Sequence, residues 1–273
     1  MKQYYKNAAI ALCMMVLSVM VSSAGNKINL KESYHLKRGI ELFDQHENDA
    51  ALESLKKEVK EHDNNGYAYF WMGKIHYVNK KYGLALEAAN KAIKHIKKDN
   101  DTMSEVYLLR ARVYRKLEDG GQALYDYDQS IQLRPKLVDT YKERGSYLTE
   151  LEKYDQSDLD YQKVKELRPG LPDGYLGLGQ NELLRKNHQK AIECFEYARK
   201  LNPEDGNVYS YLAEAKAALK RYDEAAEDVV KGMSIGNSIE VDVDMMNELF
   251  KYAYPALTAQ LKIQHNKNRK EDY

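Results

Sequence analysis

Small and apolar residues return to equivalent positions of the chain every 34 residues. Ala191 and Ala225 keep this interval towards the C-terminal end, and Ala51 and Ala85 keep it towards the N-terminal end. Turn-like segments, such as residues 118–121 and 186–188, divide the intervals. Periods of roughly 20–50 residues are typical of solenoids and arrays, and this one fits a pair of helices. The pattern therefore predicts an all-α fold of repeated helix-turn-helix units.

Six such blocks follow one another, over residues 32–65, 66–99, 104–137, 138–171, 172–205 and 206–239. Pro135, Pro169 and Pro203 each end the second helix of a block, because proline disfavours the helical conformation of the residue before it. Residues 100–103 are an insertion between the second and third blocks. We expect this insertion to lengthen a loop, and the Thr-Met-Ser-Glu sequence of residues 102–105 predicts a capping box that restarts the helices.

The aromatic, small and proline positions of the blocks resemble those of the tetratricopeptide repeat (TPR) family over residues 32–239. In the fifth block, family positions 4, 7, 8, 20, 24, 27 and 32 are occupied by Tyr175, Leu178, Gly179, Ala191, Phe195, Ala198 and Pro203. Glu182 departs from the family at position 11, and the first and last blocks are degenerate, as terminal repeats usually are. The resemblance implies a right-handed α-solenoid of six 34-residue TPR repeats.

Residues 240–273 do not complete a seventh repeat. Apolar residues recur there at helical spacing in two stretches, the second of which Pro255 opens. Because an open solenoid end would expose apolar surface, we expect C-terminal capping helices followed by a basic tail. The alternative is an amphipathic helix that docks a partner or a membrane.

The first 24 residues have the organisation of a secretory signal peptide. Lys2 and Lys6 precede an apolar run from Ala8 to Val21, and small residues lead to a cleavage site after Ala24. The run is shorter than the roughly 20 residues of a transmembrane helix, although an uncleaved anchor is the alternative. We therefore expect an exported protein, periplasmic or secreted and bacterial, with a linker over residues 25–31. A eukaryotic secretory-pathway protein is the alternative origin.

Composition narrows the classes of function. The 42 Lys+Arg residues balance the 42 Asp+Glu residues, which argues against nucleic-acid binding, and the mean hydropathy of −0.72 excludes a polytopic membrane protein. After signal cleavage Cys194 is the one thiol left, so no internal disulfide can form, and we expect it to pack as a small core residue. No catalytic motif or metal-ligand spacing occurs, so we expect no enzyme, no cofactor and no metal site.

Two runs rich in Tyr and Asp, at residues 125–128 and 154–161, suggest a cation or sugar site at first sight. The helical period instead predicts that their Tyr side chains point inward and their Asp side chains point into solvent. His76 stands at family position 11, where we expect it to pack in place of an aromatic residue.

The resemblance implies that a partner binds the concave surface, which the family lines with positions 2, 5, 6, 9, 12 and 13 of the first helix of each repeat. In the second and third blocks these positions give the candidate partner-binding residues Tyr67, Phe70, Trp71, Lys74, Tyr77, Leu108, Arg112, Arg115 and Lys116. Trp71, the one Trp of the chain, is either an anchor in this groove or a residue that the first block covers. We expect a non-catalytic scaffold for a peptide or protein segment; the alternatives are a small-ligand or glycan receptor and an enzyme with a dispersed site.

Overall fold

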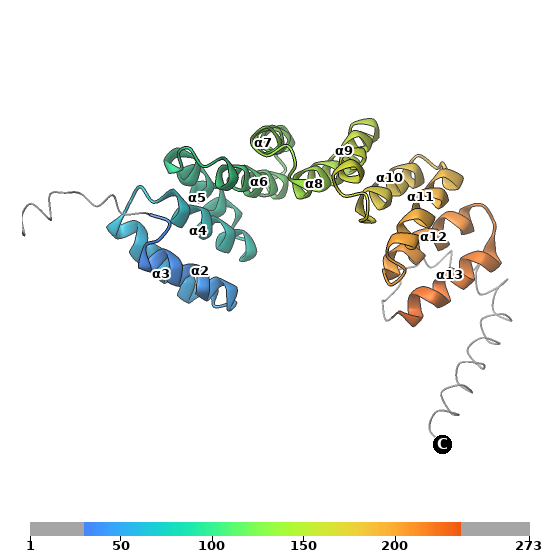
Figure 1. Cartoon of the computed structure of the whole chain (residues 1–273), viewed down its shortest axis with the longest axis horizontal. Coiled ribbons are helices and arrows are strands. Elements are labelled where there is room, and N and C mark those ends of the chain that lie inside the picture. Colours follow the sequence, from blue (N-terminus) through green and yellow to red (C-terminus); the bar gives the residue numbers. More distant parts are fainter. Residues whose placement is uncertain (1–29, 236–273) are drawn as a thin grey trace, which may run out of the picture. The chain divides into compact units, whose positions relative to one another are not determined.

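The computed structural model describes residues 30–235, in which twelve α-helices follow one another without a strand (Figure 1). The chain divides into two compact units, residues 1–133 and 134–273. The described part of the first unit consists of α2 (Tyr34–Asp44), α3 (Asn48–Glu61), α4 (Gly66–Val78), α5 (Tyr82–His95), α6 (Asn100–Lys116) and α7 (Gly120–Leu133). That of the second unit consists of α8 (Val138–Glu150), α9 (Tyr154–Leu167), α10 (Asp173–Leu184), α11 (His188–Leu201), α12 (Gly206–Ala218) and α13 (Tyr222–Ser234).

Consecutive helices pack as hairpins inside each unit. The pairs are α2 with α3, α4 with α5 and α6 with α7 in the first unit, and α8 with α9, α10 with α11 and α12 with α13 in the second. Neighbouring hairpins of a unit also pack on one another. The expected all-α array of helix-turn-helix repeats is confirmed for residues 30–235. The predicted signal peptide and C-terminal cap, most of the linker and the last residues of the sixth block lie outside this range.

The six hairpin turns share one backbone geometry. The residue after the C-cap has a positive φ of 57–64° in every turn, at His46, Lys80, Glu118, Glu152, Lys186 and Lys220. The next N–H donates to the carbonyl five residues earlier, as from Glu47 to Leu42 at 2.8 Å, which is the Schellman motif. Glycine usually occupies this left-handed position, so a side chain there costs roughly 1–2 kcal/mol of backbone energy. The turn is therefore imposed by the packing of the two helices.

Glycines let α10 approach its neighbours closely. A Cβ at Gly179 would lie 2.5 Å from Cε1 of Phe195 on α11, and a Cβ at Gly177 would lie 2.2 Å from Cε1 of Tyr161 on α9. Both aromatic side chains are buried. Each glycine thus makes room for a ring of the adjoining helix, and at Gly179 the two residues are family positions 8 and 24 of one repeat.

The insertion at residues 100–103 lengthens a helix instead of a loop. The helix α6 begins at Asn100, and the side chain of its N-cap Asp99 accepts a hydrogen bond from the backbone N–H of Thr102 at 3.1 Å. The predicted capping box at Thr102 is therefore wrong. Asp99 is also bound by Lys31, at 2.6 Å, and by the hydroxyl of Tyr67, at 3.1 Å, which fixes the start of the helix three residues earlier.

Buried ion pairs join the two helices of single hairpins in both units. Arg110 on α6 donates to both carboxylate oxygens of Asp126 on α7, at 2.7 and 2.8 Å, and Asp126 is fully buried. Arg144 on α8 binds Asp160 on α9 in the same way, at 2.9 and 2.6 Å. The prediction that the Asp side chains of the two runs point into solvent is wrong for this pair of aspartates, because each has an arginine partner on the facing helix. Tyr127 points inward as predicted, whereas Tyr125 is exposed, so the prediction is wrong for Tyr125.

Candidate functional site

The candidate partner-binding residues come from α4 and α6 of the first unit, whose starts are both fixed by side-chain caps. Asn65 accepts hydrogen bonds from the backbone N–H groups of Tyr67 and Ala68 at the start of α4. Asp99 caps α6. These caps set the register in which the side chains of the two helices are presented.

Trp71 lies against the first hairpin without being enclosed by it. Its ring meets that of Phe43 on α2 edge-on, with centroids 5.6 Å apart, and that of Phe70 at a tilt, with centroids 5.9 Å apart. Trp71 is half-buried and packs against the apolar clusters on both sides of α4. One part of the indole therefore belongs to the packing between hairpins, and another part meets solvent.

Lys74 places its ammonium group among these rings. Its Nζ lies 3.8 Å from the ring centroid of Trp71, 5.4 Å from that of Phe70 and 5.7 Å from that of Phe43. We call Phe43, Phe70, Trp71 and Lys74 the aromatic–lysine cluster. Burial lowers the pKa of Lys74, and the charges of Glu105 and Asp44 oppose this shift while that of Arg112 adds to it. The cluster is a cation–π arrangement with charged side chains of α6 nearby.

Phe43 is the member of the cluster that the sequence analysis missed. It stands at position 12 of the first block, one of the positions that line the concave surface in the family. The same rule that selected residues from the second and third blocks would have found it. The degenerate sequence of the first block drew attention away from this position.

Several candidates have structural roles. The hydroxyl of Tyr67 donates to Asp99, burial raises the pKa of Tyr67, and Lys31 lies over its ring at 4.9 Å. Tyr77 packs against Tyr82, with centroids 5.8 Å apart. Two further candidates are buried, so the expectation that they lie on the surface is wrong.

These two are Phe70, which is 5% exposed, and Leu108, which is 6% exposed. Phe70 packs with Ala89, Ala92 and Ile96 of the neighbouring helix. Arg112 and Arg115 are half-buried and Lys116 is exposed. The side chains left to meet a partner on this face are therefore Trp71, Lys74 and the basic residues of α6.

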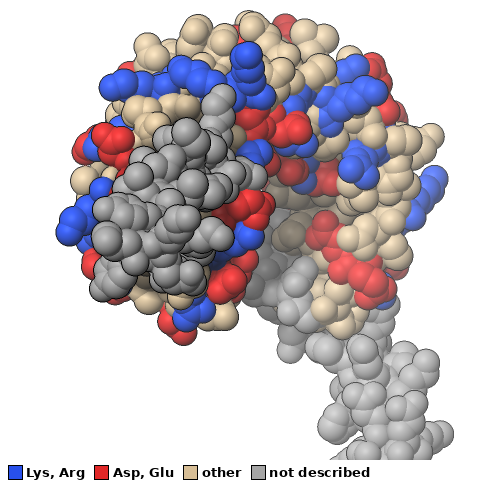
Figure 2. Space-filling model, turned by 60° about the vertical axis from the view of Figure 1, so that its left-hand side comes forward, with Lys and Arg blue, Asp and Glu red and all other residues tan. Residues whose placement is uncertain are grey.

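The described surface that faces the viewer in Figure 2 carries no single sign of charge. Lys and Arg side chains are interspersed with Asp and Glu side chains over the described surface that Figure 2 turns to the viewer. Within residues 30–235 no helix is long and apolar enough to cross a membrane, and no cluster of His, Cys, Asp and Glu could hold a metal ion. Short-range contacts, and not the net field, therefore decide what this surface binds.

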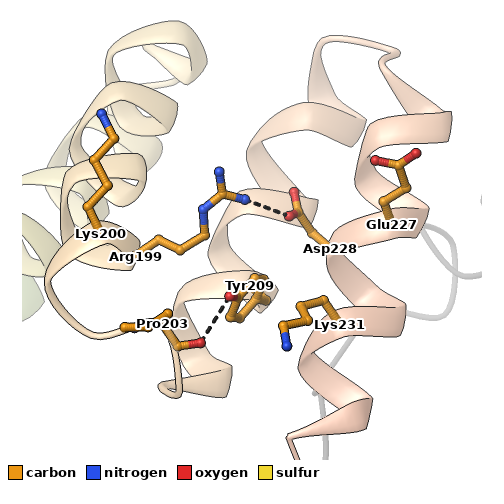
Figure 3. A pocket seen from close by; sticks show the side chains of 7 residues that line it. All are labelled: Arg199, Lys200, Pro203, Tyr209, Glu227, Asp228 and Lys231. Atoms are coloured by element: carbon orange, nitrogen blue, oxygen red, sulfur yellow. Dashed lines mark hydrogen bonds and ion pairs between the residues drawn. The ribbon is translucent and has the colours of Figure 1, made fainter.

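A second feature is a pocket of about 400 Å³ in the second unit, formed by α11, α12, α13 and the turn between α11 and α12. It is lined by Arg199, Lys200, Pro203, Tyr209, Glu227, Asp228 and Lys231 (Figure 3). The hydroxyl of Tyr209 donates to the carbonyl of Pro203 at 2.9 Å. Arg199 reaches across from α11 to Asp228 on α13, at 3.5 Å.

A lysine of α12 compensates the charge of Asp228. The Nζ of the buried Lys216 lies 2.5 Å from its carboxylate. Burial raises the pKa of Asp228, and the charges of Lys216 and Arg199 counteract this shift. The sequence analysis did not find this pocket, because it considered only the first helix of each repeat, whereas most of the lining residues come from second helices.

Comparison with known proteins identifies the repeats. The family model described as tetratricopeptide repeat matches residues 36–101 and 176–233. A TPR protein from Parabacteroides merdae has 20% sequence identity and a TM-score of 0.67, over 88% of this chain and 92% of its own. The C-terminal part of a TPR-containing protein from Cytophaga hutchinsonii has 21% identity and a TM-score of 0.62, over 73% of this chain and 78% of its own.

A third solved structure is YrrB, described as a TPR protein with an unusual peptide-binding site. It has 20% identity and a TM-score of 0.55, over 73% of this chain and 97% of its own. No curated protein shows significant sequence similarity to this chain. At these identities the solved structures establish the fold of the repeats.

Proposed function

Because this chain is a tetratricopeptide-repeat protein, we propose that it is an exported, non-catalytic scaffold that binds a peptide or protein segment on the α4–α6 face of its first unit. The observation that carries the proposal is the aromatic–lysine cluster, in which a half-buried Trp71 and the ammonium of Lys74 lie near the charges of α6. Partly exposed Trp and Arg side chains are the residues most enriched among binding hot spots.

The helices hold these side chains in place before a partner arrives. Trp71 is braced by Phe43 and Phe70, and α6 is anchored at its start by Asp99. A preorganised face loses little conformational entropy on binding, which favours affinity for a flexible segment. The peptide-binding site named for the TPR protein YrrB is in keeping with this mode of action.

Export is supported by the first 24 residues alone, with their basic start, apolar run and small residues before Gly25. We propose periplasmic or secreted localisation in a bacterium. The test is mass spectrometry of the protein from fractionated cells. A mature chain that begins at Gly25 and leaves the membrane fraction with the soluble exported proteins supports the proposal, whereas a full-length chain in the cytoplasm contradicts it.

Binding on the α4–α6 face is tested by crosslinking in cells, followed by mass spectrometry of the captured proteins. The Trp71→Ala variant should lose a specific partner, and the purified pair should bind about 30-fold more weakly, a loss of roughly 2 kcal/mol. Tyr125→Ala is the matched control, because Tyr125 is an exposed aromatic residue on α7 of the same unit. The lysine contribution is measured with Lys74→Met, which keeps the apolar stem.

Trp71 is also a reporter, because it is the one Trp of the chain. A partner that covers it should change the intrinsic fluorescence of the wild-type protein, and the Tyr125→Ala protein should respond equally. Equal capture of all partners by Trp71→Ala and wild type, at equal abundance and Tm, would refute the proposed site. A fluorescence response to saccharides without any captured protein would favour the glycan-receptor alternative.

A further inference from the structure

The pocket on the second unit is lined mostly by second helices of the repeats, whereas the α4–α6 face of the first unit is built from first helices. We propose that it forms, with the neighbouring side chains Lys165, Tyr175 and Tyr197, a binding surface for an acidic peptide segment. One aromatic side chain of that segment enters the pocket. This inference is independent of the proposed function, because it uses residues of the second unit alone.

In the preceding, fifth repeat, an aromatic ring fills the place that corresponds to the pocket. Tyr197 on α11 stacks on Tyr175 of α10, with ring centroids 5.3 Å apart and planes at 14°. The residues 34 positions later are Lys231 and Tyr209. Where the fifth repeat has an aromatic ring, the sixth has a lysine, and a pocket of about 400 Å³ opens beside Tyr209. The pocket therefore has the place of a missing ring, and its volume is within the roughly 300–1,000 Å³ of ligand pockets.

The second repeat, residues 66–99, also has a lysine at this position, and there the lysine is paired. In the second repeat, Lys91 binds Glu87 at 2.7 Å and lies over the ring of Tyr69 at 5.4 Å. The sixth repeat has the same residue types at the same positions, Glu227 and Lys231, yet these two side chains point apart across the pocket in Figure 3. Within residues 30–235 the Lys231 ammonium forms no ion pair, so it is available to a carboxylate of a partner.

The surface beside the pocket adds two further lysines on aromatic rings. Lys165 lies 4.2 Å from the ring centroid of Tyr175, and Lys200, which also lines the pocket, lies 5.2 Å from that of Tyr197. Neither lysine forms an ion pair with a carboxylate of the described residues. Tyr197 is 55% exposed, so a partner can reach its ring beside Lys200. Aromatic faces flanked by unpaired ammonium groups suit a chain of alternating acidic and aromatic side chains.

The acidic side chains at the pocket do not cancel this attraction. Asp228 is neutralised by Lys216 and approached by Arg199, and Arg199 also binds Glu196. Glu227 is the exposed acid of the lining, and its single charge stands against those of Lys200 and Lys231. The ammonium groups of Lys200 and Lys231 therefore decide the sign of the pocket rim.

The test is fluorescence anisotropy with the full chain and a labelled peptide of sequence Glu-Asp-Tyr-Glu-Asp. The Lys200→Glu, Lys231→Glu double variant should bind this peptide at least about tenfold more weakly than wild type. The matched control is the Lys94→Glu, Lys190→Glu variant, which makes the same charge change at exposed lysines that do not line the pocket and should stay within about twofold of wild type. Peptides with Gln and Asn for the acids, or Ala for the Tyr, should also bind more weakly.

A second variant fills the pocket without reversing a charge. Lys231→Tyr should place a ring on Tyr209, as Tyr197 does on Tyr175, and should abolish the advantage of the tyrosine peptide over the alanine peptide while the protein stays folded. No binding of the acidic peptide up to about 1 mM, an equal loss in the control variant, or an undiminished preference for tyrosine in Lys231→Tyr would overturn the proposal.

Discussion

Substitution of alanine for Gly177 tests whether close helix approach determines the stability of the second unit. A Cβ at this position would lie 2.2–2.3 Å from three atoms of the Tyr161 ring, and that ring is 6% exposed and so has no space to move into. Overpacking of a closed core costs roughly 1–3 kcal/mol. Alanine in a helix gains about 1 kcal/mol over glycine. Contacts as short as 2.2 Å put the overpacking at the upper end of its range, about 3 kcal/mol, so we expect a net destabilisation of about 2 kcal/mol.

The same substitution at Gly83 is the matched control, because a Cβ there meets nothing within 4 Å. Gly83 lies in the first turn of α5, where Gly83→Ala should stabilise the protein by up to about 1 kcal/mol. Thermal unfolding followed by circular dichroism should show opposite shifts, with a fall of about 4–8 °C for Gly177→Ala. Urea unfolding gives the free energies, provided that the slope of the transition is unchanged.

A third protein separates the clash from other effects of the added methyl group. Tyr161→Leu opens the space that the Cβ needs, so Gly177→Ala should cost less in the Tyr161→Leu background than in the wild type. A Gly177→Ala protein as stable as the Gly83→Ala protein would refute the reasoning. It would mean that α9 and α10 separate at little cost and that the glycine is not required by packing.

Three further substitutions test other parts of the structure. Burial opposes the ionisation of Asp99, but hydrogen bonds from Lys31 and Thr102 outweigh it and hold the pKa of Asp99 below its usual range. The stability that Asp99 adds is therefore present above about pH 5 and is lost as the pH falls towards about 2. In the Asp99→Asn variant, the free energy of unfolding should depend less on pH across that window. Asp126→Ala removes the ion-pair partner of the half-buried Arg110 and should cost about 3 kcal/mol in urea unfolding, most of which replacement of both residues by leucine should restore. Lys186→Gly removes a side chain from a φ of 63° and should raise Tm by a few degrees, about 0.5–1 kcal/mol; a lower Tm would contradict the strain assigned to that turn.

The repeat period predicted the helical hairpins because it reflects packing that every repeat has in common. Features that belong to one repeat were harder to predict. The start of α6 depended on Asp99, which is a strong N-cap only because Lys31 and Tyr67 come to the same carboxylate from distant parts of the chain. Nothing in the local sequence of residues 99–105 distinguishes that cap from one at Thr102.

The binding face was predicted in part for a similar reason. Family positions located Trp71 and Lys74, whose side chains do form a cluster. The same positions also selected Phe70 and Leu108, which are buried because the actual spacing of neighbouring hairpins, and not the position in the repeat, decides exposure. The pocket depends on one residue, since Lys231 stands where the preceding repeat has Tyr197.

Comparison of the repeats explains the buried charges and the free thiol together. Arg110 and Arg144 occupy equivalent positions and pair with aspartates that are also equivalent. In the fifth repeat the arginine position is Leu178 and the aspartate position is Cys194, so both members of the pair are replaced at once. Burial raises the pKa of the Cys194 thiol, which favours its protonated form.

In the sixth repeat the aspartate is also paired, but with a cation from a different position. Its arginine position is Leu212, yet its aspartate position keeps the acid as Asp228, and the missing cation is supplied by Lys216 one turn further along α12. At this repeat position of the described residues, each buried aspartate has a cation of the facing helix as its partner. Removal of one partner alone would leave a buried charge, which costs far more than loss of the pair. The cysteine is thus the apolar solution to a position that three other repeats fill with an ion pair.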